Sequence, residues 1–145
     1  MANFGKFLEY KEKWTDESLQ SDLNSFLANF LKQQGRKVIG KTMLRTPVDT
    51  GALRASWQLG NIEEKTNSFE ITIENNQEYA SYVEYGTVER QWKYKDGVYM
   101  LTKSINDVEQ KINQDFDKEF TKFLKDKGIG EWYMGKQLNQ HLQLD

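Results

Sequence analysis

Two long stretches in which apolar residues recur every three or four positions constrain the fold of this chain most. They run over residues 18–44 and 101–127, and each carries polar side chains on its opposite side. This spacing is that of an amphipathic α-helix with one apolar stripe. We therefore predict two long helices. Pro47 limits the first, because the residue before a proline avoids helical geometry, and Gly128 and Gly130 end the second.

Two glycines, Gly35 and Gly40, interrupt the first predicted helix. Each lowers the helix propensity by about 1 kcal/mol relative to alanine. Since glycine has no side chain, another segment can approach it closely. We expect a bend or a close contact at these two positions.

Between the predicted helices the pattern changes to that of β-strands. The segment FEITIE at 69–74 alternates apolar with polar residues, which is the period of a half-buried strand. Residues 57–62 form a second candidate strand, and the polar segment EEKTNS is the turn between the two. Residues 88–100 indicate a hairpin or a long loop, with Asp96-Gly97 as its turn signal.

These elements predict an α+β fold, with a long N-terminal amphipathic helix, a small antiparallel sheet and a long C-terminal helix packed on the sheet. The chain has 145 residues, of which 37% are hydrophobic, so one core is expected. We predict a single α+β domain over residues 1–127. Residues 128–145 have too few apolar positions to fold alone and are expected to form an extended C-terminal arm.

The composition excludes several classes of protein. The chain contains no cysteine, so it has no disulfide framework, no thiol nucleophile and no thiolate metal site. No segment approaches the roughly 18 consecutive apolar residues of a membrane span, and the first residues lack the apolar core of a secretory signal. We expect a soluble protein with no membrane partner.

Charge is balanced overall but uneven along the chain. The 20 basic and 22 acidic residues give a net charge of −2, whereas dedicated nucleic-acid-binding domains are usually strongly basic. Residues 1–60 hold nine basic and six acidic side chains, and residues 61–100 hold four and eight. Opposite charges in the two segments suit head-to-tail contact between copies, although pairing within one chain would give the same pattern.

Two segments have a dense and unusual composition, TPVDTGALRASW at 46–57 and YASYVEYGT at 79–87. In the first, Asp49 is the acid that one would first suspect of catalysis. A catalytic acid needs an oriented partner, and the single histidine, His141, lies in the predicted arm. We therefore interpret Asp49, or Thr50, as the N-cap of a short helix.

The remaining acidic residues offer no better catalytic or metal site. Glu78, Glu84 and Glu89 are six and five positions apart, so they do not share one helical face, and no liganding histidine accompanies them. We interpret them as a solvated or interface-facing acidic edge. The sequence predicts no catalytic residue, no metal site and no cofactor, and hence a protein that is not an enzyme.

Lys37, Lys41 and Arg45 are four residues apart and align on one face of the first predicted helix. This basic face could bind nucleic-acid phosphates. The interpretation that we favour is a solvated face, or one that pairs with the acidic segment of a neighbouring copy. No aromatic stacking platform accompanies it, which counts against binding of single strands.

The aromatic residues of the second segment and of the following loop have two interpretations. Part of the strip around Tyr82 and Tyr85 is expected in the core by default, but tyrosine is also enriched at interfaces. The loop after it carries further aromatic residues that a small core does not easily accommodate. The candidate subunit-interface residues are Tyr82, Tyr85, Trp92, Tyr94 and Tyr99.

Taken together, the two segments resemble a known family. TPVDTGALRASW, preceded by a long basic helix and followed by EYASYVEYGT at 78–87, is similar to the neck (gene-product-ten-like) family of tailed bacteriophages, also labelled head–tail joining, tail-completion or minor structural proteins. GVYMLTKSI at 97–105 is similar to the Gram-positive branch of that family. Related particles without DNA-filled heads, such as defective prophages and phage-tail-like particles, also keep such a protein. The likeness covers residues 18–127. The motif corresponds here to Thr46, Pro47, Val48, Asp49, Thr50, Gly51, Leu53, Arg54, Tyr79, Ala80, Tyr82, Val83, Glu84, Gly86 and Thr87.

The resemblance implies a non-enzymatic virion component that is assembled in the bacterial host cytoplasm. Such a protein forms a homo-oligomeric ring, six-fold or twelve-fold, in the neck at the head–tail or tail-end junction. Its expected partners are further copies of itself, a head-closure or portal-side protein, and tail terminator, tube or sheath proteins, with DNA as a candidate occupant of the lumen. The alternative function is a nucleic-acid-binding or packaging-associated factor that uses the basic face.

Overall fold

The computed structural model describes residues 17–48, 51–66, 68–88 and 94–128. The chain divides into two compact units. The helical unit comprises the described residues of Met1–Phe30, Thr66–Ser68 and Lys111–Asp145, and the mixed unit comprises those of Leu31–Lys65 and Phe69–Gln110. The predicted division into a domain at 1–127 and an arm at 128–145 stays a prediction, because residues 129–145 lie outside the described residues.

Both long helices are present within a residue of their predicted bounds. Helix α2 spans Glu17–Arg45 and helix α5 spans Met100–Asp126. α2 ends two residues before Pro47, as the restriction on the residue before a proline requires. Gly128 follows α5 with φ of 70°, and its N–H donates to the Lys125 carbonyl over 3.0 Å. A left-handed glycine just after the last turn is a common helix C-cap.

The core of the helical unit combines aromatic rings from both helices with buried leucines, among them Leu23 and Leu27. Phe26 lies with its ring centroid 4.9 Å from that of Phe123, and Phe30 meets Phe116 edge-on at 5.4 Å. Phe116 is fully buried, and burying such a side chain contributes about 1.5–3 kcal/mol. At its edge, Lys127 Nζ lies 2.9 Å from a carboxylate oxygen of Asp22.

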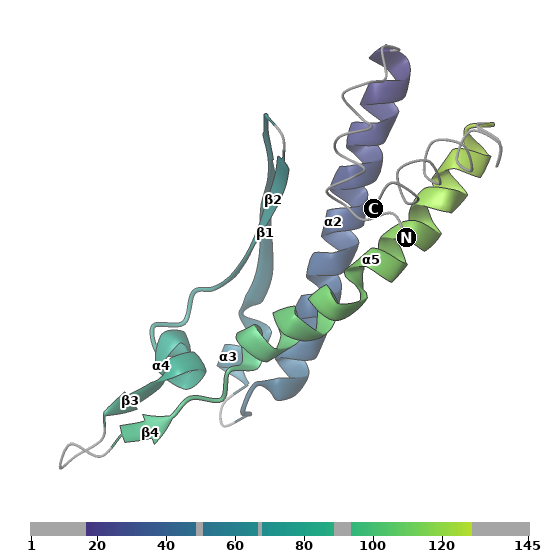
Figure 1. Ribbon diagram of the computed structural model, residues 1–145. Helices are drawn as coiled ribbons and strands as arrows, with labels where there is room; N and C mark the ends of the chain where they lie inside the picture. The colour runs from purple at the N-terminus through teal and green to yellow at the C-terminus, as the bar shows by residue number, and fades with distance from the viewer. Residues whose placement is uncertain (1–16, 49–50, 67, 89–93, 129–145) are drawn as a thin grey trace. The chain divides into compact units, whose positions relative to one another are not determined.

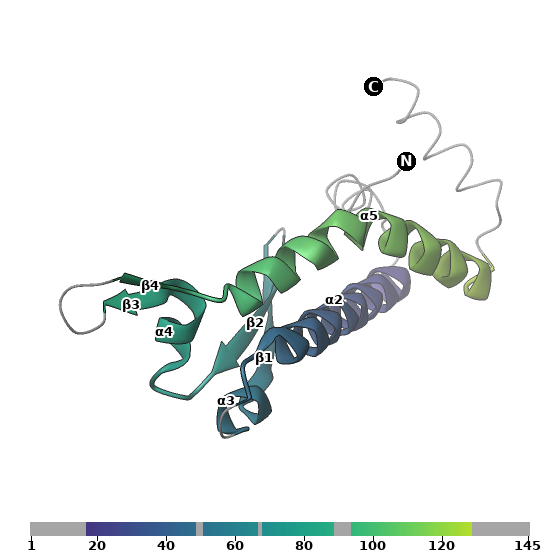
Figure 2. The same ribbon diagram turned by 90° about the horizontal axis from the view of Figure 1, so that it is seen from below.

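The mixed unit contains both small sheets and two short helices. Strands β1 (Trp57–Lys65) and β2 (Ser68–Asn75) form a hairpin, which Figures 1 and 2 show beside α2. Helix α3 (Ala52–Ala55) precedes the hairpin and helix α4 (Ala80–Tyr85) follows it. The hairpin extends beyond the predicted strands, so most of EEKTNS is strand and the connection is shorter than predicted.

Gly35 of α2 is where the hairpin packs on the helix. A Cβ atom built on Gly35 would lie 2.6 Å from Leu59 Cδ2 and 3.4 Å from Ile71 Cδ1. The close contact expected at Gly35 is therefore present. A Cβ on Gly40 would meet nothing within 4 Å, so no contact within the described residues explains that glycine.

The second hairpin consists of β3 (Gly86–Val88) and β4 (Tyr94–Asp96), which pair antiparallel with Gly86 opposite Asp96. A hairpin in this region was predicted, but its turn was placed wrongly. Asp96 ends β4 and Gly97 leads into α5, so the connection lies at residues 89–93, outside the described residues. The physical reason for Gly97 is packing, which is described below.

The fold class is α+β, as predicted. Among the described residues, no helix is both long and apolar enough to cross a bilayer.

Candidate assembly surface

The first motif segment supports the C-terminal end of α2. Arg54 of α3 donates from Nε to the Met43 carbonyl over 2.8 Å. The last carbonyls of a helix have no partner within the helix, and basic side chains often bind them. Thr46 is buried and accepts a hydrogen bond from Trp57 Nε1 at 3.0 Å. The hydrogen bonds of Arg54 and Thr46 therefore hold α3 and β1 against the C-terminal end of α2.

The end of β2 and the residues after it are hydrogen-bonded to α3 and to the residue that follows α3. Asn75 Nδ2 donates to the Leu53 carbonyl over 2.8 Å, and Gln77 Nε2 donates to Ser56 Oγ over 2.9 Å. These amides precede the second motif segment directly, so they fix the place where α4 begins. The buried Leu53 side chain completes the junction.

Glu84 caps the N-terminal end of α5, although it is 17 positions away from Leu101 in the sequence. Its carboxylate accepts hydrogen bonds from the backbone N–H groups of Leu101 (2.7 Å) and Thr102 (3.0 Å) and from the Thr102 hydroxyl (2.8 Å). The residue is only 4% exposed. A carboxylate at this place satisfies donors that the helix itself leaves without partners, and it interacts favourably with the helix dipole. The interpretation of Glu84 as part of a solvated or interface-facing edge was therefore wrong, whereas Glu78 is exposed as expected and Glu89 lies outside the described residues.

The backbone around Glu84 packs tightly on the entry to α5. Val98 N–H donates to the Val83 carbonyl over 2.8 Å, and Tyr99 N–H donates to the Glu84 carbonyl over 3.0 Å. A Cβ on Gly97 would lie 2.1 Å from the Glu84 carbonyl oxygen, so only glycine fits. Tyr99 has φ of 53°, which is uncommon for a residue with a side chain. Helix α4 is thus held by α5, and no sequence pattern indicated this contact.

The tyrosines of α4 and its neighbours lie on the surface. Tyr82 is 60% exposed and Tyr85 is 59% exposed, and Tyr79 and Tyr99 are exposed to a smaller degree. The default expectation of a core role does not hold for these side chains. Tyr85 and Tyr99 contact each other edge-on, with ring centroids 6.4 Å apart. We call Tyr79, Tyr82, Tyr85 and Tyr99 the tyrosine surface.

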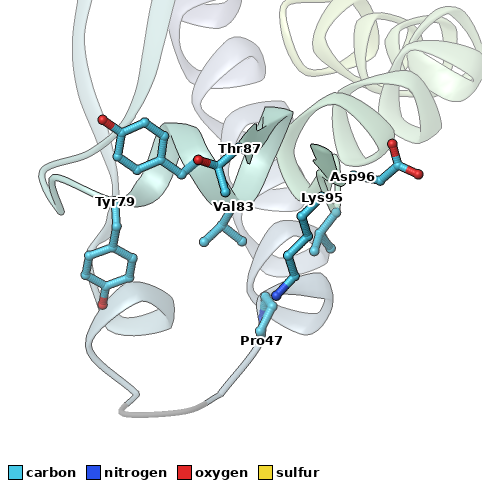
Figure 3. A pocket seen from close by; sticks show the side chains of 8 residues that line it. Pro47, Tyr79, Val83, Thr87, Lys95 and Asp96 are labelled. Carbon is cyan, nitrogen blue, oxygen red and sulfur yellow. The ribbon is translucent and has the colours of Figure 1, made fainter. Parts of the chain in front are cut away.

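A shallow hollow of about 240 Å³ borders this surface. Its lining consists of Pro47, Tyr79, Tyr82, Val83, Thr87, Lys95, Asp96 and Val98. Figure 3 shows the Lys95 side chain extending toward Pro47, while the carboxylate of Asp96 points away from the hollow. The hollow joins the two motif segments, since Pro47 belongs to the first and Tyr79 to the second. Its walls are mostly apolar, so it suits an apolar group of another molecule rather than a reaction.

The family comparison matches this part of the chain. A family model described as "Bacteriophage HK97-gp10, putative tail-component" matches residues 6–86, more than half of the 145 residues. The chain belongs to this HK97-gp10-like family. The match includes both motif segments except Thr87. The comparisons with curated proteins and with solved structures found no match.

Membership in the HK97-gp10-like family makes the chain a structural protein of a bacteriophage particle and places it in the virion. Such tail components are typically not enzymes. In the described part of the chain, no group of three or more histidine, aspartate or glutamate side chains is arranged to hold a metal ion.

Several predicted motif and interface residues lie beyond what the structure describes. Asp49 and Thr50 are outside the described residues, so their capping role stays a prediction. Gly51 occupies the position before α3, with φ of 78°. Trp92 and the side chain of Tyr94 are also outside the described residues. The interface role of Tyr82, Tyr85 and Tyr99 stays a prediction as well, although their exposure is compatible with it.

The three residues of the predicted basic face differ in the structure. Lys37 and Lys41 are exposed. Arg45 is only partly exposed and binds within the chain, with Nη2 2.6 Å from Asp107 Oδ2 and Nη1 2.9 Å from Ser104 Oγ. Because Arg45 holds α2 against α5, it is a poor candidate for binding phosphate. The nucleic-acid alternative stays a prediction, with Lys37 and Lys41 as its two exposed residues.

Proposed function

We propose that this HK97-gp10-like protein forms a closed homo-oligomeric ring in the neck of the particle, at the head–tail or tail-end junction. The observation that carries this proposal is the tyrosine surface. Its four exposed tyrosines lie just before α4, in α4 and just before α5, where hydrogen bonds within the chain hold the backbone. Tyrosine is favoured at interfaces, where it supplies apolar area and a hydrogen-bonding hydroxyl.

The contacts beneath the tyrosine surface support the same proposal. Glu84 lies between Tyr82 and Tyr85 in the sequence, and its carboxylate binds the N-terminus of α5. The backbone that carries these two tyrosines is therefore held by contacts within the chain. A backbone that is already ordered loses less conformational entropy on association.

The family suggests the partners that this surface would meet. A ring of six or twelve copies would contact a head-closure or portal-side protein on one side and tail terminator, tube or sheath proteins on the other. Each copy of a cyclic ring presents two different surfaces to its neighbours. A protein that stays monomeric in solution until a growing particle offers a template would fit the same proposal.

The experiment that tests the function combines one substitution with particle analysis. Tyr85→Ala is expected to abolish incorporation of the protein into particles while the purified chain keeps its melting temperature, because the side chain is 59% exposed. Quantitative mass spectrometry of purified particles measures the incorporation. A Tyr85→Ala protein that unfolds would show that Tyr85 is structural. Absence of the unaltered protein from purified particles would contradict the proposed function itself.

A further inference from the structure

Four residues of α2 lie on one side of the helix and are exposed to solvent. Lys37, Gly40, Lys41 and Leu44 are spaced by three, one and three positions, which is the spacing of a single helical face. Leu44 is 80% exposed, more than any other large hydrophobic residue in the described part of the chain. We call these four residues the α2 strip.

Gly40 is the unexplained member of this strip. Glycine disfavours helix, and a close packing contact is one reason for a glycine inside a helix. Gly35 has such a reason within the chain, since Leu59 and Ile71 occupy the space of its missing side chain. A Cβ on Gly40 would meet nothing within 4 Å. A close approach by another molecule would supply the reason that the described chain does not.

The outer face of the β1–β2 hairpin has the opposite charge. Ile71 points toward α2 at Gly35, and side chains alternate along a strand, so Glu70, Thr72 and Glu74 point away from α2. Both glutamates are exposed. Glu70 also pairs with Lys65 at 2.8 Å, whereas Glu74 accepts a long hydrogen bond of 3.4 Å from Gln58 Nε2.

The α2 strip and this outer face lie on opposite sides of the mixed unit. Leu44 follows Gly35 by nine positions, and about 3.6 residues make one turn. Nine residues are therefore two and a half turns, which puts Leu44 on the side of α2 away from the hairpin. Two complementary surfaces on opposite sides of one molecule favour head-to-tail contact rather than a two-fold dimer.

The two surfaces also run in the same direction. Gly35 of α2 lies at Ile71 of β2. Further along both elements, Met43 and Asn75 are linked through α3, because Arg54 binds the Met43 carbonyl and Asn75 binds that of Leu53. Along α2, the strip begins with Lys37 and Lys41 and ends with Leu44. Along β2, which runs in the same direction, Glu70 and Glu74 come first and the tyrosine surface follows.

We propose that the α2 strip of one copy packs on the outer face of the β1–β2 hairpin of the next copy. Lys37 and Lys41 face Glu70 and Glu74, the backbone at Gly40 approaches the sheet closely, and Leu44 points toward the tyrosine surface. Repeating this contact by rotation about an axis parallel to both surfaces closes a ring. The inference rests on the proposed function and names the surfaces through which the ring forms.

Charge reversal tests the pairing. Lys41→Glu is expected to lower the number of copies in purified particles roughly tenfold, because like charges then face each other across the contact. The double variant Lys41→Glu/Glu74→Lys restores the opposite charges and is expected to recover incorporation. The matched control is Lys122→Glu, at an exposed position of α5, which should leave incorporation unchanged. Normal incorporation of Lys41→Glu, or a double variant no better than the single one, would overturn the proposal.

Gly40→Ala tests the close approach without risk to the fold. Alanine stabilises a helix relative to glycine, and the added methyl group meets nothing in the described chain. The purified variant is therefore expected to melt at the same or a higher temperature, yet to be incorporated several-fold less. Incorporation equal to that of the unaltered protein contradicts a close contact at Gly40.

These results separate the inference from the proposed function. If the unaltered protein is found in particles but all charge and glycine variants are incorporated normally, the α2 strip is not the contact and the ring forms elsewhere. If the unaltered protein is absent from particles, the proposed function is wrong, and the proposed contact between copies is wrong as well.

Discussion

Two charged residues of the motif, Arg54 and Glu84, act on the ends of the two long helices. Arg54 binds a carbonyl in the last turn of α2, and Glu84 binds two N–H groups in the first turn of α5. Both roles need a helix end brought near by the tertiary fold. The sequence placed Glu84 in the motif but could not show its burial, because its partners Leu101 and Thr102 are 17 and 18 positions away.

The Glu84→Ala substitution measures how much this cap contributes to the free energy of unfolding. The substitution leaves two backbone donors and a hydroxyl without their charged acceptor, and we expect the free energy of unfolding to fall by about 2–3 kcal/mol. Denaturant unfolding of the purified chain measures the change. Glu78→Ala, at an exposed glutamate of the same region, is the control and should change stability by less than about 0.5 kcal/mol. Equal effects from the two variants would refute the capping role.

At the scale of elements, periodicity was a good guide to the long helices and a poor one to the short segments. α2 and α5 begin and end within a residue of their predicted bounds, since each spans many turns with one buried stripe. Helix α4 was not predicted, because a six-residue helix whose tyrosines are exposed shows no apolar period. Asp96-Gly97 was taken for a hairpin turn, although Gly97 is required by the Glu84 carbonyl beside it.

Alanine substitutions at Gly97 and Gly35 are expected to change the stability of the protein by different amounts. Gly97→Ala places a methyl group against backbone that cannot move aside, and we expect a loss of about 3 kcal/mol or more. At Gly35 the obstacle is the end of the Leu59 side chain, which can rotate, and alanine improves the helix, so the net change should stay within about 1 kcal/mol. Thermal or denaturant unfolding of the two variants shows which substitution lowers the free energy of unfolding more. A Gly97→Ala protein as stable as Gly35→Ala would contradict the tight packing of α4 on α5.

At the scale of the whole molecule, the chain is a structural phage protein of the HK97-gp10-like family, and its tyrosine surface is exposed. The sequence suggested this function through the motif pair alone, whereas the surfaces that would meet a neighbour required the fold. Lys37 and Lys41 were candidates for nucleic acid or for an acidic neighbour. Arg45 is bound to Asp107 within the chain, and the neighbouring copy proposed as the partner of Lys37 and Lys41 stays a proposal.

We propose that copies of this chain close into a ring in the neck of the particle, and a reconstruction of the assembled particle by electron microscopy would show whether they do. We expect a single ring of this chain between head and tail, or at the tail end, with α2 of each copy against the β1–β2 hairpin of the next. A particle in which the chain is absent from that junction, or is present there as an isolated copy, would refute the ring.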